Sequence, residues 1–336
     1  MAHPMSTRVE ALCESTTDRT LNASEPCFIC AGELKETQPF GDKPKVVRCR
    51  ACGTESLRPL PSPEDLREHY RDYSLTKSSD EQILLLASMG IETLKFYLGK
   101  TDLADKPRRD IRFLDVGFGN GAGLFAGSML GFQSYGVDLD SVSVTSGTDF
   151  ARKHGLRVTC VEGTLATLAG HTVRFDLVKA SQILEHVLDP LRFINEISAL
   201  QPEGGYLIIE CPNNEAAFWW LKNRTRKLFG RLNYYNSLKL QEHLWGFNKK
   251  SLSLLLKRAG YRSIMVRDYA AGNAIFEPES VLWYPTLPGG LRHSIANRTW
   301  EALMYACVRA FDSIASYLWH RGTGLAVLCQ KQDSAI

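Results

Sequence analysis

The sequence predicts an α/β fold in which a doubly wound parallel sheet carries helices on both faces. From Ile111 onward, short apolar runs alternate with helical patterns, as a parallel sheet with crossover helices requires. The first run ends in the glycine-rich turn Gly117-Phe-Gly119-Asn-Gly121, and the second ends in Asp138. Upstream of these runs, four cysteines form two close pairs, which indicates a small separate module.

The stretch from Ile111 to Asp140 is typical of a strand, a glycine turn, a helix and a second strand. Glycines allow the backbone to turn sharply and approach a ligand closely, and the helix N-terminus offers free N–H groups. A carboxylate at the end of the second strand, Asp138, can accept both ribose hydroxyls of an adenosine. The stretch therefore predicts a site for a nucleotide-type cofactor.

Two cofactors compete for this site. Gly117, Gly119 and Ala122 satisfy the dinucleotide fingerprint, with an acid about 20 residues further on, so an NAD-dependent oxidoreductase is one alternative. Asp115 and Gly121 extend the pattern to D-x-G-x-G-x-G, which resembles motif I of class I S-adenosylmethionine-dependent methyltransferases. An acid beside the glycines would attract the methionine ammonium but repel a pyrophosphate. The sequence thus favours S-adenosylmethionine.

Two further blocks, FDLVKASQILEHVLDP and PEGGYLIIECPN, resemble the same family in the correct order, so the resemblance spans Ile111 to about Tyr261. It implies a Rossmann-like seven-stranded sheet with an antiparallel last strand. The family's adenine-flanking turn matches Gly163 and Thr164 here. Because ligands bind at the carboxyl ends of such strands, we expect three side chains beside the cofactor, with helix capping as their alternative role: Gln182, Glu185 and His186.

The two cysteine pairs, Cys27/Cys30 and Cys49/Cys52, are separated by 18 residues, which is zinc-ribbon spacing. Each pair places two thiolates on one turn, and two turns complete a tetrahedron around Zn²⁺. Four thiolates leave no open position, so the metal is expected to be structural; a redox role is the alternative. With the ribbon, the chain resembles bacterial methyltransferases that carry an N-terminal zinc module, among them sugar C-methyltransferases.

A histidine after an acid, Glu242-His243, stands just before the predicted helix Lys249 to Arg258 and is another block that resembles the family. His243 is the candidate general base, because a neutral imidazole can remove the proton of a hydroxyl nucleophile near pH 7. Glu242 would orient it or bind a sugar hydroxyl, and His186 is the second candidate. The alternative is that His243 only ties down a lid by hydrogen bonding.

Two segments depart from a minimal core. The stretch 215–247 mixes basic and aromatic residues, so it is expected to be a lid, with an anionic membrane surface or a phosphorylated substrate as alternative contacts. A helix predicted from Ser294 to Trp319 has one apolar face, typical of core or dimer packing. As a hypothesis, this insertion and the lid shape the acceptor pocket.

The domain organisation follows from these parts: a flexible tail (1–24), the ribbon (25–60), a helical connector (61–108), the core (109–271) and the insertion with the final strand (272–336). The net charge of +3 is too small to indicate nucleic acid, no apolar run approaches the ~20 residues of a membrane span, and the N-terminus lacks a secretory signal. We therefore expect a cytoplasmic protein, with homodimerisation and peripheral membrane contact left open.

Together these features predict a methyltransferase that uses S-adenosylmethionine, contains structural Zn²⁺ and acts on a small-molecule acceptor such as a saccharide, nucleotide sugar or natural product. An oxygen nucleophile is the first expectation and carbon the second. Besides the oxidoreductase, a non-catalytic ribbon-bearing adaptor is the other alternative. The intact Asp115, Asp138 and three glycines argue against the adaptor, because a site without a ligand does not need them all.

Overall fold

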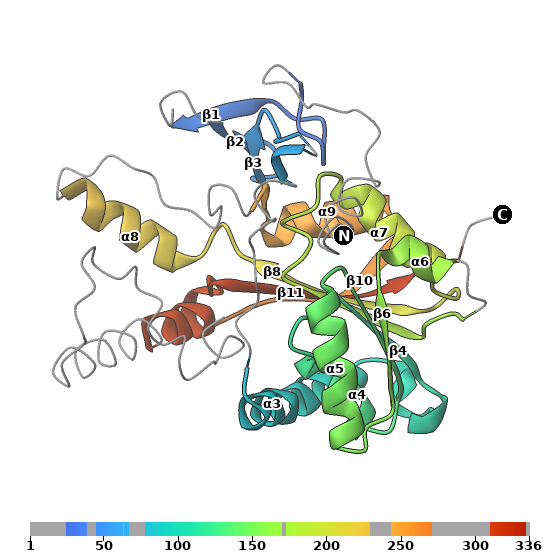
Figure 1. Ribbon diagram of the computed structural model, residues 1–336. Coiled ribbons are helices and arrows are strands. Elements are labelled where there is room, and N and C mark those ends of the chain that lie inside the picture. The colour runs from blue at the N-terminus through green and yellow to red at the C-terminus, as the bar shows by residue number, and fades with distance from the viewer. Residues whose placement is uncertain are drawn as a thin grey trace, which may run out of the picture.

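The computed structural model describes the following parts of the chain: residues 25–38, 45–62, 64–66, 78–169, 173–228, 243–270 and 310–333. Within these parts, a large sheet forms the centre, helices cover both of its faces, and the cysteine-containing module lies beyond one helical layer (Figure 1).

The large sheet has seven strands in the order β10-β11-β8-β7-β4-β5-β6. Its members are β4 (Arg112–Val116), β5 (Gln133–Asp138), β6 (Val158–Glu162), β7 (Leu177–Ser181), β8 (Tyr206–Pro212), β10 (Tyr261–Tyr269) and β11 (Gly324–Lys331). Only β11 runs antiparallel to its neighbours β8 and β10, which confirms the predicted fold class. The chain moves outward in one direction through β5 and β6, then returns to the other side of β4 as β7, so the topological switch point lies between β4 and β7.

Apolar side chains on both faces of the central strands explain this arrangement. In β8, every residue from Tyr206 to Cys211 is buried, and β11 is buried from Gly324 to Cys329. One hydrophobic core contains Leu114, Val178 and Ile209, and a second contains their strand neighbours Phe113, Leu177 and Ile208. Strands buried on both faces need a helical layer on each side.

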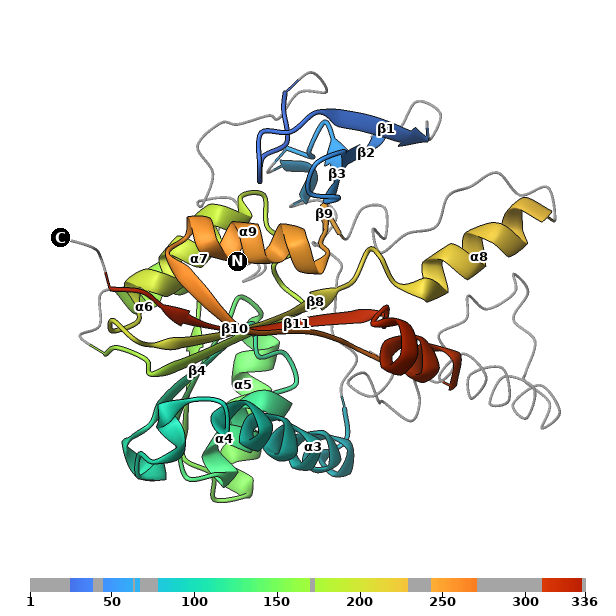
Figure 2. The same ribbon diagram turned by 180° about the vertical axis from the view of Figure 1, so that it is seen from behind.

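Figures 1 and 2 show these two layers. One face is covered by α3 (Asp80–Leu98), α4 (Ala122–Met129) and α5 (Ser141–Lys153), and the other by α6 (Leu165–Ala169), α7 (Pro190–Ala199) and α9 (Lys249–Arg258). Two short 3-10 turns, Asp102–Ala104 and Arg108–Asp110, connect α3 to β4.

Local sequence sets the helix ends. Ser79 and Gln82 form a capping box at the start of α3, and Asn248 and Ser251 form one at the start of α9. Asp189 caps α7 immediately before Pro190 at the first helical position. The predicted helix from Lys249 to Arg258 matches the structure residue for residue.

The cysteine module contributes three antiparallel strands, β1 (Leu34–Gln38), β2 (Lys45–Cys49) and β3 (Glu55–Arg58). A fourth strand, β9 (Trp245–Gly246), joins the free edge of β3 from nearly two hundred residues later in the chain. The sequence predicted the module but not this strand. The module therefore shares a sheet with the segment that follows His243.

Two helical segments extend from the same side of the molecule, α8 (Ala217–Leu228) and residues 310–319 (Figures 1 and 2). The latter is the described end of the helix predicted from Ser294; residues 294–309 lie outside the described parts, as do the tail 1–24 and lid residues 229–242. No helix in the described residues is long and apolar enough to cross a membrane.

Candidate functional site

The glycine-rich turn after β4 adopts the backbone shape that a close-fitting ligand loop needs. Gly117, Gly119 and Gly121 have φ values of 63°, 54° and 82°. A Cβ built on Gly117 would lie 2.2 Å from Cδ1 of Ile183, so this turn packs directly against the loop that follows β7. Only glycine fits there, because both the backbone angle and the space exclude a side chain.

Asp115 lies buried near the end of β4, with its carboxylate against the first turn of α4. A Cβ on Gly123 would come within 2.4 Å of Oδ2, so the glycine makes room for this carboxylate. Burial raises the pKa of Asp115 to about 6, while the positive charge of Lys179 opposes that rise. The carboxylate is therefore ionised at neutral pH and can attract an ammonium group.

A row of charges runs from Asp115 across the sheet. Lys179 in β7 lies opposite Asp115 in register, and its Nζ is 3.3 Å from Oε2 of Glu210 in β8. Glu210 also accepts hydrogen bonds from the hydroxyls of Ser181 and Tyr97. Burial alone would raise the pKa of Glu210, but the charge of Lys179 and these hydrogen bonds hold it below its usual value. The network keeps alternating charges buried beside the proposed cofactor site.

Asp138 ends β5 and organises the same turn. Its Oδ2 accepts a hydrogen bond of 2.8 Å from the backbone N–H of Gly119, and Oδ1 accepts one of 2.9 Å from Asp140. Each carboxylate oxygen has further acceptor capacity for ribose hydroxyls. The predicted pair of acids, Asp115 and Asp138, thus lies on either side of the glycine turn.

The turn after β6 lies next to Asp138, because the Gly163 N–H donates to the Asp138 carbonyl over 2.9 Å. Gly163 has a φ of 137°. The hydroxyl of the next residue, Thr164, accepts a hydrogen bond from the Ala166 N–H. These two predicted adenine contacts therefore stand at the same sheet edge as the glycine turn.

The loop after β7 joins two parts of the site. Gln182 has a left-handed φ of 57°, unusual for a residue with a side chain, and its N–H donates to the Glu210 carbonyl over 2.7 Å. Ile183 then contacts the glycine turn, and Glu185 points to the opposite side, toward residue 243. One short loop thus carries Gln182, the contact of Ile183 with the glycine turn, and Glu185 with His186.

Glu185, His186 and His243 form a cluster whose polar atoms all lie within 4.8 Å of one another. Oε1 of the fully buried Glu185 is 3.8 Å from Nε2 of His186 and 4.0 Å from Nε2 of His243. The two imidazole rings meet edge to face with their centroids 4.7 Å apart. A carboxylate at these distances stabilises a protonated imidazole, and the same three groups are of the type that bind a metal ion. Glu242 lies outside the described residues.

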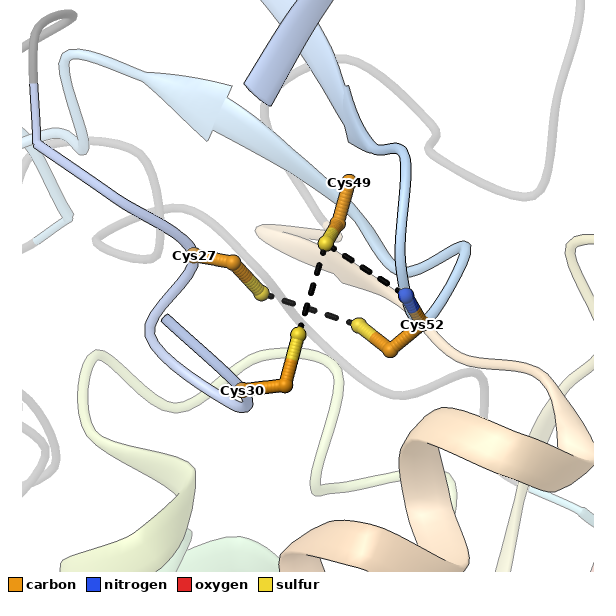
Figure 3. A group of neighbouring side chains, drawn as sticks. All are labelled: Cys27, Cys30, Cys49 and Cys52. Atoms are coloured by element: carbon orange, nitrogen blue, oxygen red, sulfur yellow. Dashed lines mark hydrogen bonds between the residues drawn. The ribbon is translucent and has the colours of Figure 1, made fainter. Parts of the chain in front are cut away.

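The four cysteines converge as the spacing predicts (Figure 3). Sγ of Cys27 lies 3.6 Å from Sγ of Cys52, and Sγ of Cys30 lies 3.5 Å from Sγ of Cys49. Hydrogen bonding between the two thiols lowers the pKa of Cys27 and raises the pKa of Cys52. Crossed pairs of sulfurs at these distances fit the corners of a tetrahedral zinc site. No disulfide links them.

Sequence analysis missed Lys179, Glu210 and Tyr97, and it did not assign Glu185 a role with His243. A signal existed for two of them, since a lysine and a glutamate interrupt the apolar runs of β7 and β8. Charged residues in strands covered on both faces are rare unless they are paired. Lys179 and Glu210 together therefore indicate an ion pair inside the sheet.

Comparisons with known proteins identify the family of the chain. The model of the family described as "Methyltransferase domain" matches residues 94–266. A ubiquinone biosynthesis O-methyltransferase of Parvibaculum lavamentivorans is 27% identical over 124 residues, which are 36% of this chain and 48% of that protein. The match thus spans about half of the length of that relative.

Two solved structures are similar at low identity. The (4+2)-cyclase SpnF is 21% identical with a TM-score of 0.47, over 72% of this chain and 81% of that one. Magnesium protoporphyrin IX methyltransferase of Synechocystis with bound S-adenosylhomocysteine (SAH) is 12% identical with a TM-score of 0.44, over 80% of this chain and 94% of that one. The family model covers more than half of the chain and contains every strand of the sheet from β4 to β8. The chain belongs to the methyltransferase domain family.

Proposed function

We propose that this protein transfers the methyl group of S-adenosylmethionine to a hydroxyl of a small-molecule acceptor. One observation carries the proposal: the loop 181–186 contacts the glycine turn through Ile183 and places Glu185 and His186 beside His243. The six residues of this loop therefore join a glycine turn of the cofactor-binding type to a cluster that can accept a proton.

The residues present fit S-adenosylmethionine. Asp115 would hold the methionine ammonium, Asp138 the ribose hydroxyls, and Gly163 and Thr164 the adenine edge. The sulfonium supplies an electrophilic methyl group when the cofactor is bound. Among the proteins of known activity, the matched relatives are named O-methyltransferases, which supports oxygen as the acceptor atom.

His243 would act as the general base. Its side chain is only 9% exposed, and the fully buried carboxylate of Glu185 lies 4.0 Å from Nε2. The imidazole would take the proton of the acceptor hydroxyl during transfer, and the carboxylate would stabilise the resulting positive charge. His186, with its ring against His243, would restrict the orientation of the base or take its place. Most of the acceleration would come from alignment in a site shielded from water.

The acceptor would be a phenol or a sugar hydroxyl. The relatives named for ubiquinone biosynthesis favour a phenolic ring, whereas the zinc-ribbon resemblance favours a saccharide or nucleotide sugar. A base at this position serves both, because each acceptor loses one proton during transfer.

The test has two steps. Calorimetric titration with SAH and, separately, with NADH distinguishes the methyltransferase from the oxidoreductase; we expect micromolar binding of the former alone. Transfer of a labelled methyl group is then measured with catechols and nucleotide sugars, and the product is examined for an O-methyl or a C-methyl group. NADH binding without SAH binding would refute the proposal, and a C-methyl product would replace oxygen by carbon.

A further inference from the structure

The cysteine module contacts the methyltransferase core through the backbone of its second knuckle. The Cys52 carbonyl accepts a hydrogen bond of 3.0 Å from Nδ2 of Asn248, the residue that caps α9. The preceding carbonyl, of Ala51, accepts one of 2.6 Å from Lys250. The next, of Gly53, accepts one of 3.0 Å from Asn214, directly after β8. Three consecutive carbonyls of the metal-type turn are thus bound by the core.

From this knuckle the chain continues into β3, which holds β9. The Thr54 hydroxyl donates to the Gly246 carbonyl over 3.0 Å, and Ser56 pairs with Trp245 in antiparallel register. The Leu57 N–H then donates to the Leu244 carbonyl over 3.1 Å. These contacts are buried, so water does not compete for them.

The other edge of residues 244–246 is bound to the loop that carries Glu185. The Leu244 N–H donates to the Glu185 carbonyl over 2.7 Å, and the indole N–H of Trp245 donates to the Val187 carbonyl over 2.8 Å. His243 directly precedes this bridge. A continuous series of hydrogen bonds therefore runs from the Cys49–Cys52 turn through β9 to the cluster of Glu185, His186 and His243.

Most contacts of the donor side lie in other parts of the structure, and the loop after β7 is the part that it shares with the bridge. The contacts recorded for Asp115, Asp138 and the glycine turn involve β4 to β8, α4 and the loop after β7. Figures 1 and 2 place the cysteine module beyond the α7 and α9 layer, whereas α3, α4 and α5 lie on the far face of the sheet.

We infer that the metal-bound module positions the acceptor half of the site and leaves the donor half unaffected, with Thr54 and Asn248 as positioning residues. Metal on the four cysteines fixes the knuckle, the knuckle fixes β3, and β3 holds β9 so that His243 stays beside Glu185. This inference rests on the proposed function in one respect, the assignment of Glu185, His186 and His243 to the acceptor half of the site. Its structural content, a metal-dependent order of residues 243–248, can be measured independently of turnover.

Hydrogen–deuterium exchange of the full chain tests it. Zinc content is measured first, and exchange of peptides covering 243–248 is compared before and after removal of the metal by a chelator. We expect exchange there to become about tenfold faster or more, since buried hydrogen bonds lose their fixed partners. The SAH dissociation constant should change by less than about twofold, because donor-side contacts persist. Unchanged protection of 243–248, or a parallel loss of SAH affinity, would overturn the inference.

Two zinc-retaining variants keep the test valid if removal of the metal unfolds the chain. Thr54→Val removes the hydroxyl that donates to Gly246, and Asn248→Asp removes the donor to Cys52 while its Oδ1 still caps α9. The matched control is Thr37→Val, which removes a threonine-to-carbonyl bond of 2.9 Å within the module, away from β9. Both test variants should speed exchange at 243–248 and the control should not.

The two proposals fail differently in these experiments. If the intact protein binds no SAH, the proposed function fails while the exchange data still decide the coupling. If SAH binds and exchange at 243–248 is the same in all variants and without metal, the coupling fails and the proposed function stands.

Discussion

Asp115 and Lys179 lie opposite each other in the parallel strands β4 and β7; Asp115 is buried, and the side chain of Lys179 is 17% exposed. Burial would lower the pKa of Lys179, but the carboxylates of Glu210 and Asp115 raise it, so the lysine stays charged. Its charge in turn limits the rise in the pKa of Asp115. Lys179 thus favours the ionised form of Asp115, the acid that we propose binds the methionine ammonium, and it need not touch the cofactor to do so.

This relationship predicts how SAH affinity depends on pH. Above pH 6 Asp115 is ionised and should bind the ammonium; as pH falls through about 6, the carboxyl is protonated and the affinity should fall, approaching tenfold per pH unit. In Lys179→Gln the pKa of Asp115 should rise further, moving the loss of affinity to higher pH. Calorimetry between pH 5 and 8 measures both curves.

Asp115→Asn should flatten this profile, since the titrating group is gone. Lys106→Gln is the matched lysine control, because Lys106 forms a half-exposed ion pair with Asp176 outside the site. The explanation is wrong if Lys179→Gln folds, as shown by circular dichroism, and leaves the midpoint of the affinity curve unchanged.

Replacing Gly117 by alanine should weaken SAH binding by at least about tenfold. The new Cβ would lie 2.2 Å from Ile183, and an L-residue at positive φ costs a further ~1–2 kcal/mol. Gly155→Ala provides the control: its φ of 65° is equally left-handed, but nothing lies within 4 Å of its Cβ. Equal SAH dissociation constants in the two variants would contradict this prediction.

The sheet and the glycine turn could be predicted because their signals are local. Apolar runs, the glycine turn and the acids Asp115 and Asp138 lie close together in the sequence, and alternating strands and helices indicate a parallel sheet. The helix from Lys249 to Arg258 was likewise predicted with the bounds that it has in the structure.

The missed features depend on contacts between distant segments. Nothing in Trp245-Gly246 indicates a strand, since two residues carry no periodicity; β3 makes them one by pairing with them. Likewise, the distance from Glu185 to His243 depends on the bond between the Leu244 N–H and the Glu185 carbonyl, which joins segments nearly 60 residues apart. The roles of the site residues and the domain limits stay predictions.

Metal removal should destabilise the protein. A structural zinc ion would stabilise the module strongly, and Cys52→Ser removes one of the four proposed thiolate ligands. The Cys52 carbonyl also accepts a hydrogen bond from Asn248, the residue that caps α9. We expect zinc content to fall from about one per chain to near zero and the thermal midpoint to drop by several degrees. Cys211→Ser is the control, as that thiol is buried in the sheet away from the cluster. Two metal ions in the intact chain would indicate that Glu185, His186 and His243 hold the second.

His243→Ala should lower kcat by about 10²–10⁴-fold while the SAH dissociation constant changes little, because a general base acts on the acceptor proton and the donor residues are untouched. Glu185→Gln should lower kcat less and shift the acid limb of the pH–rate profile to lower pH, since the imidazolium loses the carboxylate that stabilises its positive charge. His154→Ala serves as control, because His154 is paired with Asp80 far along the sequence from this cluster. If His243→Ala kept full turnover and His186→Ala abolished it, His186 would be the base. In that case β9 would position His243 as a residue that only contacts the base.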